Sequence, residues 1–137
     1  MKPSAAPSHA IVLFSHGSRD PLWSAPLRAV EEQIRRDRPE QAVCSAYLEL
    51  CPPDLPTAVR QMLDEGHQHI VIVPMFLGIG KHAREDLPRL VEQLRAEHPQ
   101  AVFHLQPAIG EDLRMTRLMA DIACSPLPIG AKHPLFR

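Results

Sequence analysis

The feature that most restricts the fold of this chain is a fourfold alternation of short apolar runs with amphipathic helical patterns. The runs at 10–14 and 69–74 are continuous and rich in β-branched residues, which is typical of parallel strands covered on both faces. Weaker runs lie at 42–50 and 101–105. Strands and helices that alternate in this way predict an α/β domain built on a parallel sheet.

Each apolar run is followed by apolar side chains at the spacing of one helix face. These faces comprise Leu27, Val30 and Ile34; Leu55, Val59 and Met62; Leu87, Leu90, Val91 and Leu94; and Met115, Leu118, Met119 and Ile122. Two expected helix starts share an Asp-Leu-Pro sequence, at Asp54 and Asp86. We expect each Asp to cap free N–H groups and each Pro to fall in the first turn.

With right-handed crossovers, the βαβαβαβα order predicts a four-stranded parallel sheet of order 2-1-3-4 with helices on both faces, a flavodoxin-like half. A length of 137 residues suits a single domain. We expect residues 1–124 to form that domain and the Pro-rich segment 125–137 to be an irregular tail.

Composition argues against several classes of function. The formal net charge is −1, so a strongly cationic nucleic-acid surface is not expected. Cys44, Cys51 and Cys124 are odd in number and widely spaced, which disfavours a disulfide framework and favours a reducing compartment. The run 10–14 is too short for a signal peptide or a membrane span. We therefore expect a soluble cytoplasmic protein with no nucleic-acid or membrane partner.

Two loops that contain His are expected to meet at a ligand site. In an open α/β sheet, ligands bind beyond the carboxyl ends of the strands, where the strand order reverses. His16 follows the first strand beside Gly17, and His82 follows the third strand after Gly80. Neutral imidazole binds Fe, Co, Ni, Cu and Zn, and it accepts protons near neutral pH. Two such groups are suited to hold a metal ion and to take protons from a substrate.

Charged residues close to these loops extend the predicted site. Glu49 ends the second apolar run, where it would reach the same rim as a base or a metal-steering group. Arg19, Lys81 and Arg84 lie close in sequence to the two His and suit an anion-binding rim. Each feature also has an ordinary alternative: an incidental His in a turn, a surface carboxylate, or solvated basic side chains. Residue types alone leave both interpretations open.

Three segments, taken together, resemble the motifs of a known enzyme family. They are Phe14-Ser-His-Gly-Ser-Arg-Asp-Pro-Leu-Trp23, Tyr47-Leu-Glu-Leu with Pro53-Asp-Leu, and Pro74-Met-Phe-Leu-Gly-Ile-Gly-Lys-His82 with Asp86-Leu-Pro88. In this order and spacing they resemble the small sirohydrochlorin chelatases, the short CbiX/SirB type of class II chelatase. The resemblance runs from Ile11 to Ala123 and so covers most of the chain.

The resemblance implies a lyase that inserts Co²⁺, Fe²⁺ or Ni²⁺ into sirohydrochlorin or a related tetrapyrrole, for cobalamin or sirohaem biosynthesis. It implies metal-binding and proton-accepting roles for His16 and His82, and a catalytic role for Glu49. The residues expected to contact the substrate are Ser15, Gly17, Ser18, Arg19, Gly80, Lys81 and Arg84. The divalent metal is itself a substrate, no organic cofactor is implied, and short members of the family pair as homodimers.

Two other functions fit the same residues. A non-catalytic carrier of a metal or a tetrapyrrole would use the same two His and would differ only in the absence of turnover. A histidine-type phosphatase also begins with a strand and a His-Gly turn. It carries Arg directly before the His, however, where this chain has Ser15. We therefore rank the phosphatase below the carrier.

Overall fold

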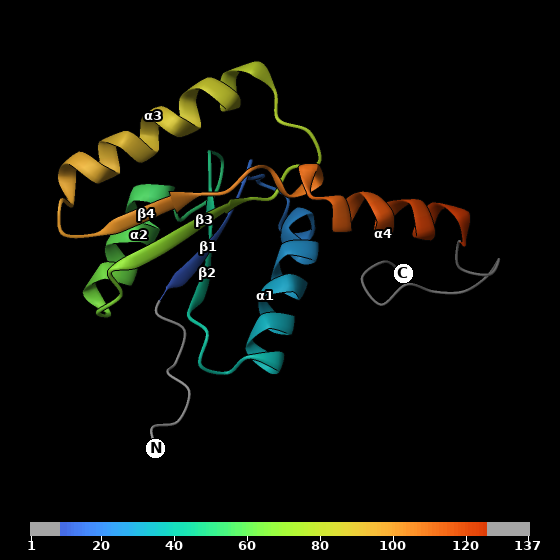
Figure 1. The fold of residues 1–137 in the computed structure, drawn as a ribbon, viewed down its shortest axis with the longest axis horizontal. Coiled ribbons are helices and arrows are strands. Elements are labelled where there is room, and N and C mark those ends of the chain that lie inside the picture. The colour runs from blue at the N-terminus through green and yellow to red at the C-terminus, as the bar shows by residue number, and fades with distance from the viewer. Residues whose placement is uncertain (1–8, 126–137) are drawn as a thin grey trace.

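The computed structural model of the 137-residue chain describes residues 9–125. Four strands and four α-helices alternate along the chain, with two short 3₁₀ helices between them (Figure 1). In chain order they are β1 (Ala10–Ser15), η1 (Pro21–Ser24), α1 (Ala25–Asp37), β2 (Val43–Tyr47), α2 (Leu55–Asp64), β3 (His69–Pro74), α3 (Lys81–Glu97), β4 (Val102–Leu105), η2 (Ile109–Glu111) and α4 (Leu113–Cys124). The predicted alternation is confirmed. The expected tail lies outside the described residues, apart from Ser125.

The four strands form one parallel sheet in the order β2-β1-β3-β4, as the sequence predicted. In the central strand, Val12 lies beside Cys44 of β2 and Ile72 of β3. The strand order reverses between β1 and β3. The loops that leave the carboxyl ends of these two strands therefore start side by side.

The hydrophobic core lies on the face of the sheet that α2 and α3 cover. Val12 and Phe14 of β1 and Ile72 of β3 point into it, because alternate residues of a strand face the same side. They pack against apolar residues of the two helices, including Val59 and Val91. All five side chains are buried. Helices α2 and α3 therefore hold the sheet, and through it the loops at its carboxyl edge, in place.

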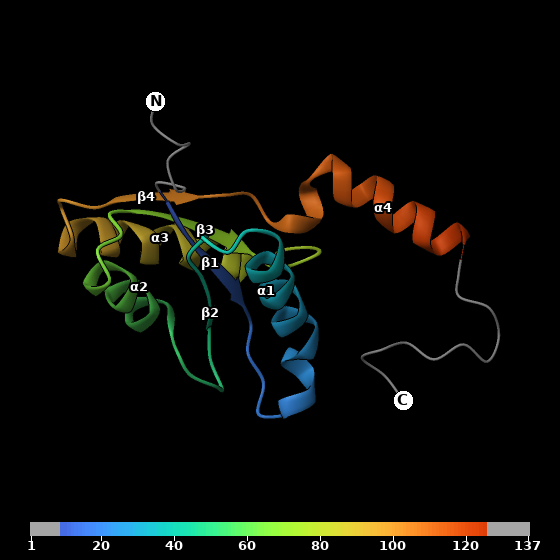
Figure 2. The same ribbon diagram turned by 90° about the horizontal axis from the view of Figure 1, so that it is seen from below.

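Among the described residues, α1 is the helix that covers the opposite face of the sheet. Helix α4 runs outward beyond α1, away from the sheet, in both views (Figures 1 and 2). No residue of α4 is buried, although its apolar positions have the expected helical spacing. Within residues 9–125, no helix combines the length and the apolar composition that a membrane crossing requires. Within residues 9–125, this face therefore carries less helical cover than the face under α2 and α3.

The two Asp-Leu-Pro sequences occupy different positions in their helices. Asp54 caps α2 as predicted, because its carboxylate accepts a hydrogen bond from the backbone N–H of Thr57 at 2.9 Å. The prediction that Asp86 caps α3 is wrong, since α3 begins at Lys81 and Pro88 lies inside it. The residues from Lys81 to Asp86 are mostly good helix formers, so the helix extends back to Gly80. His82 consequently sits in the first turn of α3 and does not precede the helix.

The three cysteines of the described region are free thiols, as their spacing predicted. Burial, with the nearby Glu31 and Glu65 carboxylates, raises the pKa of the Cys44 thiol from 9.0 to about 11. This thiol packs against the core and is protonated at neutral pH. Cys44 is therefore a structural residue of β2.

Candidate active site

Backbone hydrogen bonds carry the pairing of β1 and β2 beyond the ends of the strands. The N–H of Leu48 donates to the carbonyl of Ser15 at 2.8 Å, and the N–H of Glu49 donates to the carbonyl of His16 at 3.0 Å. Glu49 therefore lies beside His16, although β2 itself ends at Tyr47. The sequence expectation placed Glu49 at the strand end, and the extra hydrogen bonds explain why it still reaches the same edge.

Gly17 is required for this close approach. Its φ is +96°, in the region that favours glycine. A Cβ at this position would lie 1.9 Å from the carbonyl oxygen of Glu49, which is far inside van der Waals contact. The Gly after His16 thus allows the chain after β2 to pass directly beside the chain after β1.

The His16 imidazole lies against an aromatic side chain. Its ring centroid is 4.6 Å from that of Phe76, with the two planes inclined by 58°. Phe76 is buried and makes an edge-to-face contact with Phe14 at 6.2 Å. The carbonyl of Phe76 accepts a hydrogen bond from the N–H of Gly110 at 2.9 Å. The core therefore fixes the surface on which the His16 ring rests.

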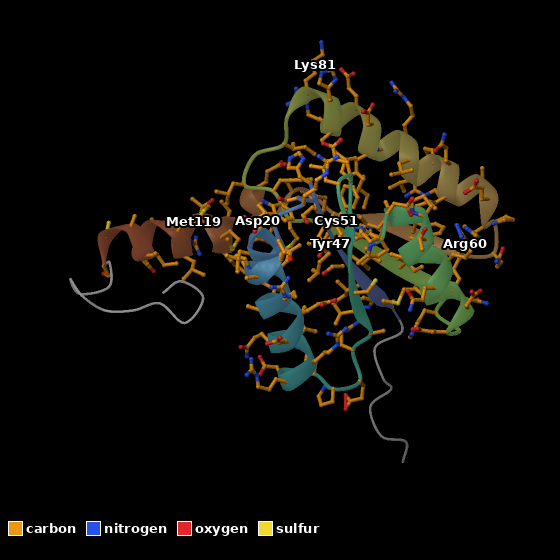
Figure 3. The ribbon with its side chains drawn as sticks, turned by 180° about the vertical axis from the view of Figure 1, so that it is seen from behind. Asp20, Tyr47, Cys51, Arg60, Lys81 and Met119 are labelled. Carbon is orange, nitrogen blue, oxygen red and sulfur yellow. The ribbon has the colours of Figure 1, made fainter. Side chains whose placement is uncertain are left out.

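An open hollow of about 560 Å³ lies at the carboxyl edge of the sheet. Its lining consists of His16, Leu48, Glu49, Gly80, Lys81, His82, Ala83 and Asp86. Five of the predicted site residues thus share one hollow: His16, Glu49, Gly80, Lys81 and His82. In Figure 3 the label of Lys81 marks the N-terminal end of α3, which borders this hollow. His16, Glu49 and His82 lie 33 to 66 residues apart in sequence, and they line one hollow because the strand order reverses at this edge.

The other predicted residues lie around the hollow. Ser15, the last residue of β1, is buried with its hydroxyl unpaired and does not line the hollow. Ser18 accepts a hydrogen bond from the N–H of Asp20 at 3.0 Å and shapes the turn after His16. Arg19 is exposed in that turn. Arg84 lines a neighbouring hollow of about 260 Å³ together with Glu111. Of the three predicted basic residues, Lys81 therefore lines the hollow, whereas Arg84 lines a neighbouring one and Arg19 lines neither.

Three residues of the hollow were missed by the sequence argument: Leu48, Ala83 and Asp86. Asp86 was assigned only to helix capping. Because α3 begins at Lys81, Asp86 lies one turn beyond His82, and residues four apart share a helix face. A correct helix start would have indicated that Asp86 faces the same hollow as His82.

Exposed apolar side chains follow three of the strands beyond their carboxyl ends. Leu22 follows β1, Leu48 follows β2 and Leu77 follows β3, and their exposed fractions are 75%, 41% and 67%. Trp23 is also part-exposed and packs edge-on against Tyr47 at 6.3 Å. Apolar groups exposed together with polar ones commonly mark a binding surface. The edge thus offers imidazole, carboxylate and ammonium groups beside an apolar surface.

Tyr47 is not suited to accept a proton at this edge. Burial, followed by the nearby Cys51, raises the pKa of its phenol above the ordinary 10.0. The phenol therefore stays protonated at neutral pH.

Among residues 9–125, no three His, Cys, Asp or Glu side chains are grouped so that they could hold a metal ion together. The groups in the hollow that can accept a proton or a metal are His16, His82, Glu49 and Asp86.

Comparison with protein families gives a match over almost the whole described chain. A model of the family called CbiX matches residues 10–124. A curated relative, the sirohydrochlorin cobaltochelatase of Methanocaldococcus jannaschii, is 33% identical over 89 residues, which are 65% of this chain and 62% of the relative. The chain spans 57% to 62% of the length of the first three curated relatives that it matches.

Two solved structures are similar in both fold and sequence. A protein assigned to cobalamin biosynthesis as CbiX, from Marinobacter aquaeolei VT8, is 33% identical with a TM-score of 0.73, over 85% of this chain and 94% of that one. The sirohydrochlorin chelatase SirB of Bacillus subtilis subspecies spizizenii, solved in complex with cobalt, is 26% identical with a TM-score of 0.67. The match covers 84% of this chain and 51% of that one.

Proposed function

The chain belongs to the CbiX family, and from this premise we propose that it inserts a divalent metal ion into sirohydrochlorin or a closely related tetrapyrrole. The observation that carries the proposal is the shared hollow, which His16, Glu49 and His82 all line. Two imidazoles and a carboxylate supply both metal ligands and proton acceptors. The names of the relatives and the cobalt in the SirB structure support the same reaction.

In this proposal His16 and His82 hold the incoming metal through their neutral ring nitrogens. His16 lies in the turn after β1 and His82 lies in the first turn of α3, so in this proposal they approach the metal from two elements and leave its other positions free. The contact with Phe76 limits the movement of the His16 ring and fixes the direction of its nitrogens. Such fixed positioning of one reactant removes part of the entropic cost of its encounter with the other.

The reaction requires proton acceptors as well as metal ligands. Two pyrrole N–H bonds break and two N–H protons leave, while four nitrogen-to-metal bonds form. The net product is the metallated ring and two protons. Glu49, whose backbone N–H donates to the carbonyl of His16, is the acceptor proposed for these protons. His16 and His82 become available as acceptors once the metal has left them.

The chemistry of sirohydrochlorin matches the two kinds of surface at this edge. Its flat ring is suited to the exposed apolar side chains Leu48 and Leu77. Its many carboxylates are suited to Lys81 at the wall and to Arg19 and Arg84 further out. Gly17, Ser18 and Gly80 shape the loops against which the ring lies, and Ser15 supports them from below. These assignments are part of the proposal.

We further propose a cytoplasmic homodimer that needs no organic cofactor. Three free thiols suit a reducing compartment. The match to SirB covers 51% of that chain, so two copies of this chain would supply the bulk that the longer protein has in one. Cobalt, iron and nickel all accept imidazole ligands, so the donor set leaves the choice among them to metal supply.

The test is an anaerobic assay of the purified chain with excess sirohydrochlorin and Co²⁺, Fe²⁺ or Ni²⁺, followed by visible absorption. We expect a rate above the protein-free rate and many turnovers per chain, with the three metals ranked by rate. A spectral change that stops at one equivalent per chain would identify a carrier. The absence of any protein-dependent change with all three metals would contradict both functions.

A further inference from the structure

The short helix η2 packs against the segment that connects β3 to α3. In Figure 1 the orange η2 lies beside the yellow-green start of this connection. The N–H of Gly110 in η2 donates to the carbonyl of Phe76 at 2.9 Å. Ala108, which precedes η2, is buried in the core. The chain after β4 is therefore held against the chain after β3.

This contact leaves no room for a side chain at position 110. A Cβ on Gly110 would lie 2.0 Å from the carbonyl oxygen of Leu77 and 2.5 Å from its Cα. Both are backbone atoms, so rotation of a side chain cannot relieve the overlap. The φ of Gly110 is not in the left-handed region. The glycine is therefore required for the close approach and not for its backbone angles.

Phe76 is held from two sides, and the His16 imidazole rests on it. The N–H of Met75 donates to the carbonyl of Phe14 in β1 at 2.7 Å, and Gly110 binds the next carbonyl from the side of η2. The Phe76 ring centroid lies 4.6 Å from that of His16. A displacement of the Phe76 backbone would therefore move the surface that supports the His16 ring.

We propose that Gly110 is a positioning residue for metal insertion. It allows η2 to reach the backbone of Phe76 and Leu77, and this contact sets where the Phe76 ring holds the His16 imidazole. Gly110 does not line the hollow, so it acts through Phe76. The consequence for the reaction rests on the proposed function, whereas the consequence for the His16 ring does not.

A second glycine provides a matched control. Gly78 lies in the connection between β3 and α3, and a Cβ added there meets no atom within 4 Å. Gly110→Ala and Gly78→Ala each remove the conformational freedom of one glycine, but only Gly110→Ala creates an overlap. The pair of variants therefore separates the contact with η2 from a general loss of flexibility.

The first measurement is a proton–carbon correlation spectrum of the imidazoles in the full chain, without metal or tetrapyrrole. The signals of His16 are identified by their loss in His16→Gln. Gly110→Ala should shift them, because the ring current of Phe76 depends on the distance and orientation of its ring. Gly78→Ala should leave them in place, and the signals of His98, which lies 6.3 Å from Phe103, should stay unchanged in both variants. Unshifted His16 signals in a folded Gly110→Ala variant would overturn the proposal.

The second measurement is the split between kcat and KM for sirohydrochlorin. Gly110→Ala should lower kcat about fivefold and leave KM within about twofold, because the orientation of His16 is lost while the walls of the hollow remain. Gly78→Ala should keep both values. A raised KM with an unchanged kcat for Gly110→Ala would overturn the positioning role and would indicate that η2 shapes the binding surface.

A milder variant keeps the proposal open to test if Gly110→Ala does not fold. Ile109→Gly loosens η2 without adding an atom near Leu77. It should shift the His16 signals in the same way by a smaller amount, and unchanged signals would contradict the proposal. The spectra do not use catalysis. If the wild type inserts no metal, they still decide whether Gly110 positions His16, and if they fail, the chelatase assay stands by itself.

Discussion

Helices α3 and α4 have the same apolar spacing but opposite environments. Leu87, Val91 and Leu94 of α3 are at most 4% exposed, whereas Leu118 and Ile122 of α4 are more than half exposed. The difference arises from the segments before the helices, because α3 returns across the sheet after an open loop and α4 leaves a capped junction that points outward. An amphipathic pattern therefore predicts that a helix has a face to bury, but it does not predict which surface covers that face.

The largest expected difference concerns stability. We expect Leu94→Asp to lower the free energy of unfolding by about 3–5 kcal/mol, because it removes core packing and leaves a carboxylate without a partner. Ile122→Asp should change the free energy of unfolding of the single chain by less than about 0.5 kcal/mol. Urea unfolding followed by circular dichroism, at a concentration low enough to keep both variants monomeric, measures the two values. Equal losses would mean that α4 packs against its own chain.

The second comparison is between the two ends of α3, because the first turn contains His82, which lines the hollow, and the other end is capped by His98. If His82 has the proposed roles of metal ligand and proton acceptor, His82→Ala should lower the rate of metal insertion by about 10²-fold or more. His98, the residue that caps the other end of α3, is the matched control. His98→Ala should leave the rate within about twofold, in line with its distance from the catalytic step. A near-normal rate for His82→Ala, with normal circular dichroism, would remove His82 from the mechanism.

Much of the fold, and part of the candidate site, was predictable from the sequence. The strand at 69–74 was predicted to the residue, and the first strand to within one residue, because β-branched runs bounded by polar turns have few alternatives. The meeting of His16 and His82 at one hollow followed from the strand order, since ligands bind where that order reverses. Their roles in catalysis stay predictions.

What the sequence did not predict depends on contacts between distant segments. The start of α3 was placed at the Asp-Leu-Pro sequence, because Pro is favoured in a first turn, yet the helix formers before Asp86 extended the helix. The contact of His16 with Phe76 joins residues 60 positions apart. The exposed face of α4 could not be foreseen, because its apolar spacing is that of a buried helix.

A third prediction compares two buried Phe residues, Phe76 before α3 and Phe103 before α4. Phe76 precedes α3 and contacts the His16 ring at 4.6 Å, whereas Phe103 lies in β4 before α4 and is 6.3 Å from His98. We expect Phe76→Leu to slow metal insertion by about tenfold, because the His16 ring loses its fixed orientation. Phe76→Tyr, which keeps an aromatic ring, should restore most of the rate.

The control for this prediction is Phe103→Leu, which should cost similar stability without slowing the reaction, since both Phe residues are buried. The pH profile of the rate separates positioning from general destabilisation. A changed orientation of His16 should shift the profile of Phe76→Leu and leave that of Phe103→Leu as in the wild type. Parallel losses of rate and stability in both variants would argue against a positioning role for Phe76.

The smallest expected effect concerns the basic residues at the two helix starts. Lys81 is the first residue of α3 and lines the hollow, whereas Arg114 of α4 is paired with Asp112 at 2.7 Å. Lys81→Ala should raise the KM for sirohydrochlorin by about twofold to fivefold and leave kcat unchanged, as expected for one exposed charge. Arg114→Ala should change neither, and Arg19→Ala should raise KM less than Lys81→Ala, because Arg19 lies outside the hollow. Added salt should reduce each difference. A lower kcat with unchanged KM for Lys81→Ala would mean that this ammonium acts on the reacting ring and does not serve as an anion-binding group at the start of α3.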